Sequence, residues 1–192
     1  MVCDSRNASG QKLVSNINVT EIEGVKLIQA SYSIDLRGKF FKFNPDNLLQ
    51  NRLGSVAVSI NPKAGTIRGI HLQVEPFAEE KLVSCIQGST FEVIVDIRND
   101  SKSFGKVATF ELSQENALQV YIPKGVAHGF QTLSEDCELI YLHTAAYHPE
   151  SERALNAGDP KVGVAWPLPI TEISEKDRTH KLIDRDFQGI TL

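Results

Sequence analysis

A short run of reactive side chains, Thr66-Ile67-Arg68-Gly69-Ile70-His71-Leu72-Gln73, is the part of the chain best equipped for chemistry. Arg68 offers a fork of hydrogen-bond donors, Gln73 an amide, and His71 an imidazole, a group that titrates close to neutral pH. Side chains three positions apart on a strand point to opposite faces, so we expect Arg68 and His71 on opposite faces and His71 and Gln73 on one. A face of this kind fits either a polar site or a core histidine whose hydrogen bonds are satisfied.

A second histidine follows a turn in Tyr121-Ile122-Pro123-Lys124-Gly125-Val126-Ala127-His128-Gly129-Phe130. Together with the spacing from Gly65 to His71, this arrangement resembles the two sequence motifs of the cupin family. Metal-binding cupins usually carry another histidine two positions after the first, where this chain has Gln73. Two imidazoles alone are a poor site for iron, manganese or zinc, so we expect no metal and no other cofactor.

One branch of the cupins matches much more of the chain, and its motifs occur here in family order. They are Arg-Gly-x-His-x-Gln at 68–73, Lys81 in Lys-Leu-Val-x-Cys, Val-Asp-Ile-Arg at 95–98, Ser-x-Ser-Phe-Gly at 101–105, Ile-Pro-x-Gly-x-Ala-His-Gly-Phe at 122–130, Asp159-Pro160, Trp166-Pro167 and Ser174-Glu175-Lys176-Asp177. Together they resemble the dTDP-4-dehydrorhamnose 3,5-epimerase family. The resemblance implies a cofactor-independent isomerase that inverts C3, C5 or both in a nucleotide-linked 4-keto-6-deoxyhexose. It also implies a place in the synthesis of deoxysugar or surface polysaccharide precursors, including O antigen.

Inverting a carbon next to a ketone requires a base, a group that stabilises the enolate oxygen, and an acid on the opposite face of the sugar. His71 suits the role of the base, and Lys81 could stabilise the enolate. The resemblance assigns the acid to Tyr141 and gives the base a carboxylate partner, Asp177, which would hold the imidazole in one tautomer. Without the resemblance, Tyr141 fits an ordinary strand tyrosine and Asp177 a surface or helix-capping carboxylate.

The resemblance also assigns residues to the nucleotide and the sugar. Arg68 matches an arginine that binds phosphate, a role that suits a guanidinium. Arg37 and Phe40 match residues that the family donates from the partner subunit of a homodimer, where the arginine meets phosphate and the phenylalanine stacks on the base. Gln73 and His128 would hold the sugar or the catalytic imidazole, and a core histidine is the alternative for His128.

Two departures from the family pattern concern the nucleotide pocket. Lys42 occupies the position of a glutamate that helps to place the nucleotide, and Val56-Ala57-Val58-Ser59 replaces a strand that often carries a glutamine and an asparagine. These changes leave dTDP, CDP and GDP open as the nucleotide and make inversion at one carbon an alternative. Two further alternatives are a metal-dependent cupin oxygenase or isomerase using His71 and His128, and a sugar-binding module on a retired epimerase scaffold.

The elements that must position these residues are mostly strands. From Gly54 to Tyr141, short apolar runs alternate with turn signals, which is typical of an all-β sandwich or barrel. In residues 89–98 every second side chain is apolar, from Phe91 to Ile97, as in a half-buried strand. Arg98, at the end of that run, fits a structural ion pair better than a site.

We therefore expect a cupin-like double-stranded β-helix, a jelly-roll barrel, as a single domain over residues 18–192. A flexible arm, residues 1–17, would precede it. Short flanking helices are expected at 44–49, where an Asn/Asp start precedes a leucine pair, and near 174–185.

The composition argues against several kinds of partner. The chain of 192 residues has a formal net charge of −4 and no basic face for nucleic acid. No run approaches the roughly 20 apolar residues of a membrane helix, and the polar first residues lack the apolar segment of a signal peptide. Cysteines at 3, 85 and 137 have neither metal spacing nor an even number for disulfides, and Cys85 is expected in the core. We expect a cytoplasmic protein without nucleic-acid or membrane partners.

Overall fold

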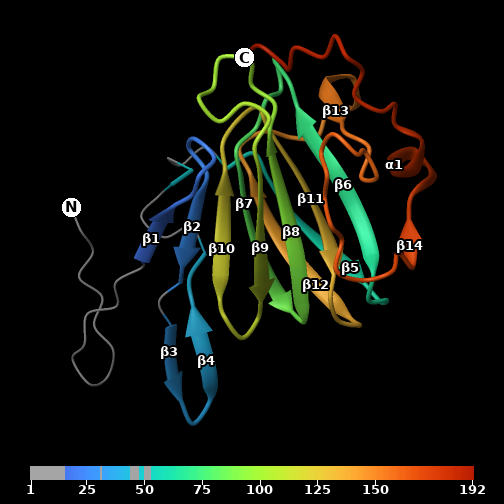
Figure 1. The fold of residues 1–192 in the computed structure, drawn as a ribbon. Coiled ribbons are helices and arrows are strands. Elements are labelled where there is room, and N and C mark those ends of the chain that lie inside the picture. Colours follow the sequence, from blue (N-terminus) through green and yellow to red (C-terminus); the bar gives the residue numbers. More distant parts are fainter. Residues whose placement is uncertain (1–15, 31, 44–47, 50–52) are drawn as a thin grey trace.

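The computed structural model describes residues 16–30, 32–43, 48–49 and 53–192, and this part of the chain is built almost entirely of strands (Figure 1). The strands are β1 (Asn16–Val19), β2 (Lys26–Gln29), β3 (Tyr32–Asp35), β4 (Gly38–Phe41), β5 (Ser55–Asn61), β6 (Thr66–Gln73), β7 (Lys81–Gln87), β8 (Ser89–Asp96), β9 (Val107–Ser113), β10 (Leu118–Ile122), β11 (Val126–Thr132), β12 (Cys137–His143), β13 (Glu152–Ala154) and β14 (Glu172–Ile173). The described helices are the 3-10 turn Pro149–Ser151 and α1 (Glu175–Thr179). Neither is long or apolar enough to cross a membrane.

Two sheets face each other and form the barrel (Figure 1). The first has the strand order β1-β2-β10-β7-β12-β5, and the second has the order β13-β6-β11-β8-β9, with β14 paired to β6 in parallel. A third sheet, the hairpin β3–β4, extends away from the barrel (Figure 1). This architecture confirms the predicted all-β, cupin-like fold.

The main core fills the space between the two sheets. Val83 and Leu139 enter it from the first sheet, and Ile94 and Phe130 enter it from the second. Cys85 is also fully buried there, as predicted. Burial of this apolar surface holds the sheets together and contributes about 25 cal/mol for each Å² removed from water.

Strand β8 is buried on both faces, so the prediction of a half-buried strand was wrong. Val93 and Ile97 point away from the barrel interior, but they are covered by a second cluster that includes Trp166 and Phe187 from the C-terminal segment. The expected alternation is present, but the C-terminal segment replaces solvent on the outer face. At the end of the strand, Arg98 pairs with a buried carboxylate, as expected.

Strand β6 contains an irregularity between its two most reactive residues. Arg68 lies opposite Phe130 of β11 and His71 lies opposite His128, so three steps along β6 match two steps along β11. Gly69, at the bulge, has φ +111°, and a Cβ there would lie 2.6 Å from a backbone carbon of β11. The extra residue reverses the alternation, and Arg68 and His71 line the same cavity. The prediction that they point to opposite faces was therefore wrong.

The C-terminal helix is shorter than predicted. Helix α1 ends at Thr179, whereas we expected helix near 174–185. Ser174 caps its first turn by accepting a hydrogen bond from the backbone N–H of Asp177, at 3.0 Å. After the helix the chain turns so that Ile183 packs on the outer face of the second sheet, which a continued helix would not allow.

Two predicted elements fall mainly outside the described residues. Of the helix expected at 44–49, the structure describes Leu48 and Leu49 only. Of the arm expected at 1–17, it describes Asn16 and Ile17, which form the start of strand β1 and pair with β2.

Candidate active site

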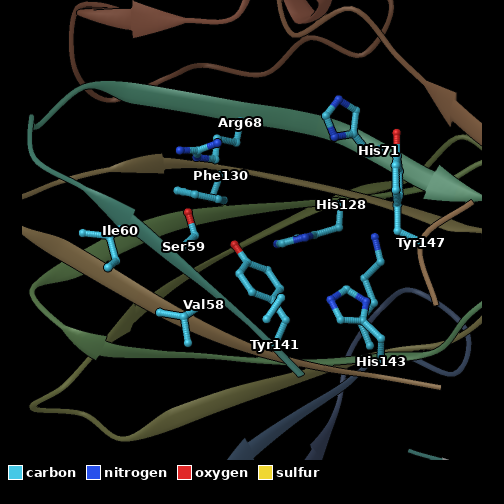
Figure 2. A pocket seen from close by; sticks show the side chains of 12 residues that line it. Val58, Ser59, Ile60, Arg68, His71, His128, Phe130, Tyr141, His143 and Tyr147 are labelled. Carbon is cyan, nitrogen blue, oxygen red and sulfur yellow. The ribbon is translucent and has the colours of Figure 1, made fainter. Parts of the chain in front are cut away.

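A cavity of about 500 Å³ opens between the two sheets (Figure 2). Lys81 at the start of β7 and Tyr141 of β12 line it from the first sheet. Arg68 and His71 of β6 and His128 of β11 line it from the second. The cavity therefore gathers polar side chains that are far apart in the sequence, and it exposes a molecule inside it to groups on both sides.

His71 and Asp177 form a hydrogen-bonded pair at the edge of the cavity. The imidazole Nε2 lies 2.7 Å from a carboxylate oxygen of Asp177, whose other oxygen accepts the backbone N–H of Gly69 at 3.3 Å. Burial alone would raise the pKa of Asp177, but the hydrogen bond and charge of His71, with smaller contributions from Gly69 and Ser174, lower it. The carboxylate stays ionised and can only accept hydrogen bonds.

This pairing determines which nitrogen of His71 can act as a base. An ionised carboxylate needs a donor, so Nε2 carries the proton of the neutral ring and Nδ1 has the free electron pair. Nδ1 lies 3.9 Å from a carboxylate oxygen of Glu152. A proton taken up at Nδ1 would therefore create a cation held between two carboxylates.

Glu152 is a site residue that the sequence reasoning missed. It accepts a hydrogen bond from the hydroxyl of Tyr147 at 2.9 Å and forms an ion pair with Lys176. These groups come together because the short strand β13 pairs with β6, so that Ala154 lies opposite His71. No motif in the sequence around Glu152 indicates that pairing.

Lys81 forms an ion pair with the carboxylate of Glu79. The ammonium lies 3.3 Å from one oxygen of Glu79, and Nδ1 of His143 lies 3.0 Å from the other. Burial would raise the pKa of Glu79, but the bonds and charges of His143 and Lys81 lower it. The sequence reasoning missed both partners, although a signal existed for His143, which lies two positions after Tyr141 on one strand and so shares its face.

Tyr141 projects into the cavity from the wall opposite His71 (Figure 2). The centroid of its ring lies 6.2 Å from that of His128 and 5.8 Å from that of His143. Burial, reinforced by the nearby charge of Glu92, raises the pKa of the phenol well above its usual value. The hydroxyl is therefore protonated at neutral pH and can donate its proton to a strong base in the cavity.

His128 belongs to a buried network on the floor of the cavity. Its Nε2 lies 2.5 Å from a carboxylate oxygen of Glu92, and the other oxygen accepts the hydroxyl of Thr90 at 2.5 Å. Burial lowers the pKa of His128 despite the raising effect of Glu92, so we assign a neutral ring that donates to the carboxylate. Its other nitrogen can then accept a hydrogen bond in the cavity.

Arg68 lies toward the end of the cavity that Ser59 and Ile60 line, away from Tyr147 (Figure 2). Its Nε donates to the side-chain oxygen of Asn61 at 2.9 Å, which fixes the guanidinium at the end of β5. The exposed apolar side chains of Val58 and Ile60, also on β5, lie along the same rim. A cation beside an apolar rim suits a ligand with a charged and a less polar part.

Gln73 is not among the residues that line the cavity. Its Nε2 donates to the backbone oxygens of Phe77 and Ala146, both at 3.2 Å, and its side-chain oxygen accepts the N–H of His148 at 2.6 Å. The amide is buried by the segments that it ties together. We correct the expectation that Gln73 holds the sugar or the imidazole, because its side chain does not line the cavity and its amide bonds to backbone groups instead.

Arg37, Phe40 and Lys42 lie away from this cavity, on or next to the hairpin β3–β4 (Figure 1). Arg37 pairs with Asp35, and the ring of Phe40 is 65% exposed. Lys42 is exposed too. Within one chain the structure does not bring these three residues to the site, so a contribution from them requires a second chain.

The two histidines proposed as metal ligands in the oxygenase alternative are engaged separately. His71 is bonded to Asp177 and His128 to Glu92, each through Nε2. Among the described residues, one group of three potential donors lies close together, and it contains His71 but not His128.

Comparison with known proteins identifies the relatives of this chain. The sequence profile of the dTDP-4-dehydrorhamnose 3,5-epimerase family matches residues 19–185. A dTDP-4-dehydrorhamnose 3,5-epimerase from Sinorhizobium fredii is 41% identical over 162 residues, which are 81% of this chain and 83% of the relative.

Solved structures with the same fold include enzymes with bound nucleotide sugars. A dTDP-6-deoxy-D-glucose-3,5-epimerase from Legionella pneumophila, in complex with dTDP-4-keto-L-rhamnose, is 37% identical with a TM-score of 0.81, covering 88% of this chain and 93% of its own. A 3'-monoepimerase from Streptomyces bikiniensis, in complex with dTDP-quinovose, is 28% identical with a TM-score of 0.78, covering 85% of each chain.

Proposed function

Because this chain belongs to the dTDP-4-dehydrorhamnose 3,5-epimerase family, we propose that it is a cofactor-independent epimerase of a nucleotide-linked 4-keto-6-deoxyhexose. One observation carries the proposal. A basic imidazole nitrogen on one sheet and a protonated phenol on the other, His71 and Tyr141, line the same cavity from opposite walls. Inversion of a carbon requires that a proton leave one face and return to the other, and this arrangement supplies a group for each face.

The reaction proceeds by exchange of a single proton at each inverted carbon. Nδ1 of His71 removes the hydrogen next to the ketone, and the electron pair moves onto the ketone oxygen as an enolate. The ammonium of Lys81 stabilises that oxygen, a contribution of about 3–4 kcal/mol by analogy with oxyanion holes. Tyr141 then donates its proton to the carbon from the opposite face. No atom changes its oxidation state overall, so the chemistry needs acids, bases and charges rather than an electron acceptor.

The surrounding carboxylates match the charges that develop during the reaction. Asp177, at 2.7 Å from His71, and Glu152, at 3.9 Å, stabilise the imidazolium that forms when the base takes up a proton. Glu79 holds the ammonium of Lys81 at 3.3 Å on the opposite wall. Charges placed before the reaction stabilise its intermediates without reorganisation, which is the main advantage of such a site over water.

On the nucleotide side, Arg68 binds the diphosphate through its guanidinium. A second copy of the chain supplies Arg37 and Phe40 from its hairpin β3–β4, and the protein is a homodimer. Two exposed apolar surfaces support this assembly. On the hairpin, Ile34 and Phe40 are 69% and 65% exposed, and on the edge strand β5, Ile60 is 64% exposed. Apolar side chains gathered on protruding or edge elements are typical of an interface.

Deuterium exchange into the substrate tests the roles of the base and the acid separately. In deuterated water, His71→Asn should abolish incorporation of deuterium next to the ketone, because no group removes the proton. Tyr141→Phe should retain exchange but lose net inversion, because proton removal survives while return from the other face does not. Exchange at the wild-type rate by folded His71→Asn would refute the assignment of the base.

Inversion at one carbon is a second candidate for the same site, favoured by the similarity to a 3'-monoepimerase. The number of deuterium atoms incorporated per sugar distinguishes the two: two atoms indicate inversion at C3 and C5, and one indicates a single position. A thermal-shift series with dTDP, CDP, GDP and UDP identifies the nucleotide, because a ligand that binds only the folded state raises the melting temperature. The apolar Val56 and Val58 of β5 give no hydrogen bonds to a base, so we expect modest discrimination at that strand.

A further inference from the structure

A third titratable side chain, His180, lies beside the pair of His71 and Asp177. Its Nε2 is 3.8 Å from the carboxylate oxygen of Asp177 that is bonded to His71, and its ring meets the ring of His71 edge-on at 6.2 Å. This nitrogen is buried and has no hydrogen-bond partner among the described residues. A buried imidazole nitrogen without a partner is energetically costly. It therefore indicates that the site can accept a further group that bonds to this nitrogen.

The three potential donor atoms are close together and their backbone is held in place. One ring nitrogen of His71, a carboxylate oxygen of Asp177 and one ring nitrogen of His180 all lie within 4.8 Å of one another. Oδ1 of Asp177 lies 2.7 Å from Nε2 of His71 and 3.8 Å from Nε2 of His180. Asn156 donates to the backbone oxygen of His180 at 2.6 Å and to that of Arg178 at 3.2 Å, which anchors the end of α1. The donors therefore come from a strand and a pinned helix end rather than from a free loop.

We propose that His71, Asp177 and His180 bind a divalent transition-metal cation such as Zn²⁺. Two imidazole nitrogens and one carboxylate oxygen are a common donor set for this ion, with bonds of about 2.0–2.2 Å. Tetrahedral geometry then separates the donors by about 3.4 Å. The separations from Oδ1 of Asp177 to Nε2 of His71 and to Nε2 of His180, 2.7 Å and 3.8 Å, lie on either side of that value. Small side-chain rotations bring the three atoms to a common centre.

The surroundings leave room for a fourth ligand. A cavity of about 480 Å³ borders His71 and Asp177 on the side of α1, so water can complete the coordination. Lys176 and Arg68 also line this cavity, and their charges oppose a cation. Lys176 is paired with Glu152 and Arg68 is anchored on Asn61. We therefore expect the cation to bind reversibly, with an affinity that comes from His71, Asp177 and His180 alone.

Metal binding would inhibit the proposed epimerisation. This inhibition, unlike the binding itself, rests on the proposed function. A cation on Nε2 of His71 displaces the ring proton to Nδ1, so the electron pair that removes the substrate hydrogen is lost. The cation also takes the charge of Asp177 that stabilises the imidazolium. Zn²⁺ would therefore be an inhibitor of the enzyme rather than its cofactor.

Isothermal titration calorimetry of the purified full-length protein with Zn²⁺ tests the binding. We expect one bound ion per chain and at least a tenfold weaker affinity in His180→Ala and in the smaller change His180→Gln. The matched control is His148→Ala, because His148 also has a buried unpartnered nitrogen but stacks on Phe77 away from the site. Equal affinity in wild type and in both His180 variants, with melting temperatures showing that they fold, would overturn the proposal.

Deuterium exchange then tests inhibition. Zn²⁺ should suppress exchange by the wild type, a chelator should restore it, and His180→Ala should remain active at the same Zn²⁺ concentration. Absence of exchange without Zn²⁺ would contradict the proposed function while leaving the binding result intact. Zn²⁺ binding that depends on His180 but does not affect exchange would refute the inhibitory role.

Discussion

Replacement of Asp177 by asparagine tests how the site fixes the base. The carboxylate has two oxygens and two donors, the Nε2–H of His71 at 2.7 Å and the backbone N–H of Gly69 at 3.3 Å. Asparagine has the same shape but only one oxygen, so one of the two donors must face an NH₂ group.

Both orientations of the asparagine impair catalysis. If the amide oxygen faces Gly69, the NH₂ group faces His71, and Nε2 must accept a hydrogen bond, which moves the ring proton onto Nδ1 and removes the base. If the oxygen faces His71, two N–H groups meet at Gly69 at a cost of about 1–3 kcal/mol. In either case the imidazolium loses a charge at 2.7 Å, worth at most about 6 kcal/mol at an effective dielectric constant of about 20. We expect a barrier raised by roughly 3–5 kcal/mol, or a kcat lower by about 10²–10⁴.

The assay is the rate of deuterium incorporation at saturating substrate, with the fold checked by thermal unfolding. Asp159→Asn is the matched control, since Asp159 is also buried and accepts two backbone N–H groups, those of Lys161 and Ile183, outside the site. It should lose stability but retain kcat. If folded Asp177→Asn exchanges deuterium within about threefold of the wild type, the carboxylate does not fix the tautomer, and the account of the base is wrong.

Three further predictions concern other parts of the molecule. Lys81→Met should lower kcat for exchange by about 10²–10³ with normal folding, because it removes the cation at the enolate oxygen, and an unchanged kcat would exclude that role. Burial would raise the pKa of Asp96, but hydrogen bonds from Arg98 and two serines lower it to about 2. The ionised carboxylate therefore stabilises the folded protein fully above its unfolded pKa near 4, and this stabilisation is lost as the pH falls toward 2. Urea unfolding should therefore show Asp96→Asn to be less stable by roughly 2 kcal/mol at pH 7, with the difference closing near pH 2. Gly69→Ala should lower the free energy of unfolding by about 3 kcal/mol or more in the same assay, because the added Cβ would lie 2.6 Å from Gly129 and φ is +111°. A decrease below about 1 kcal/mol would show that the backbone at the bulge can adjust.

The strand content and most of the chemical groups could be predicted from the sequence. Period-two alternation and frequent turn residues reflect local backbone preferences, so they predict an all-β barrel without knowledge of its contacts. His71, Lys81, Tyr141 and Asp177 were identified by type and by family motif, and the structure gathers all four at one site.

The errors have a common physical cause. The alternation rule assigned Arg68 and His71 to opposite faces because it assumes a regular ladder, and the bulge at Gly69 depends on contact with β11. Gln73 was assigned to the substrate on the basis of its face alone. One of its hydrogen bonds goes to nearby Phe77, but the other two go to the loop at 146–148, which only the folded chain brings within reach.

The sequence by itself determined which acids, bases and cations the protein has, because residue type and family motif are local properties of the chain. The tertiary structure decided how they work together. Pairing of β13 with β6 brings Glu152 to His71, and the entry of α1 places both Asp177 and His180 at the same imidazole. The facing of two sheets puts His71 and Tyr141 on opposite walls of one cavity. These arrangements bring together residues at least 70 positions apart in the sequence, and their energies depend on distances that no local pattern contains.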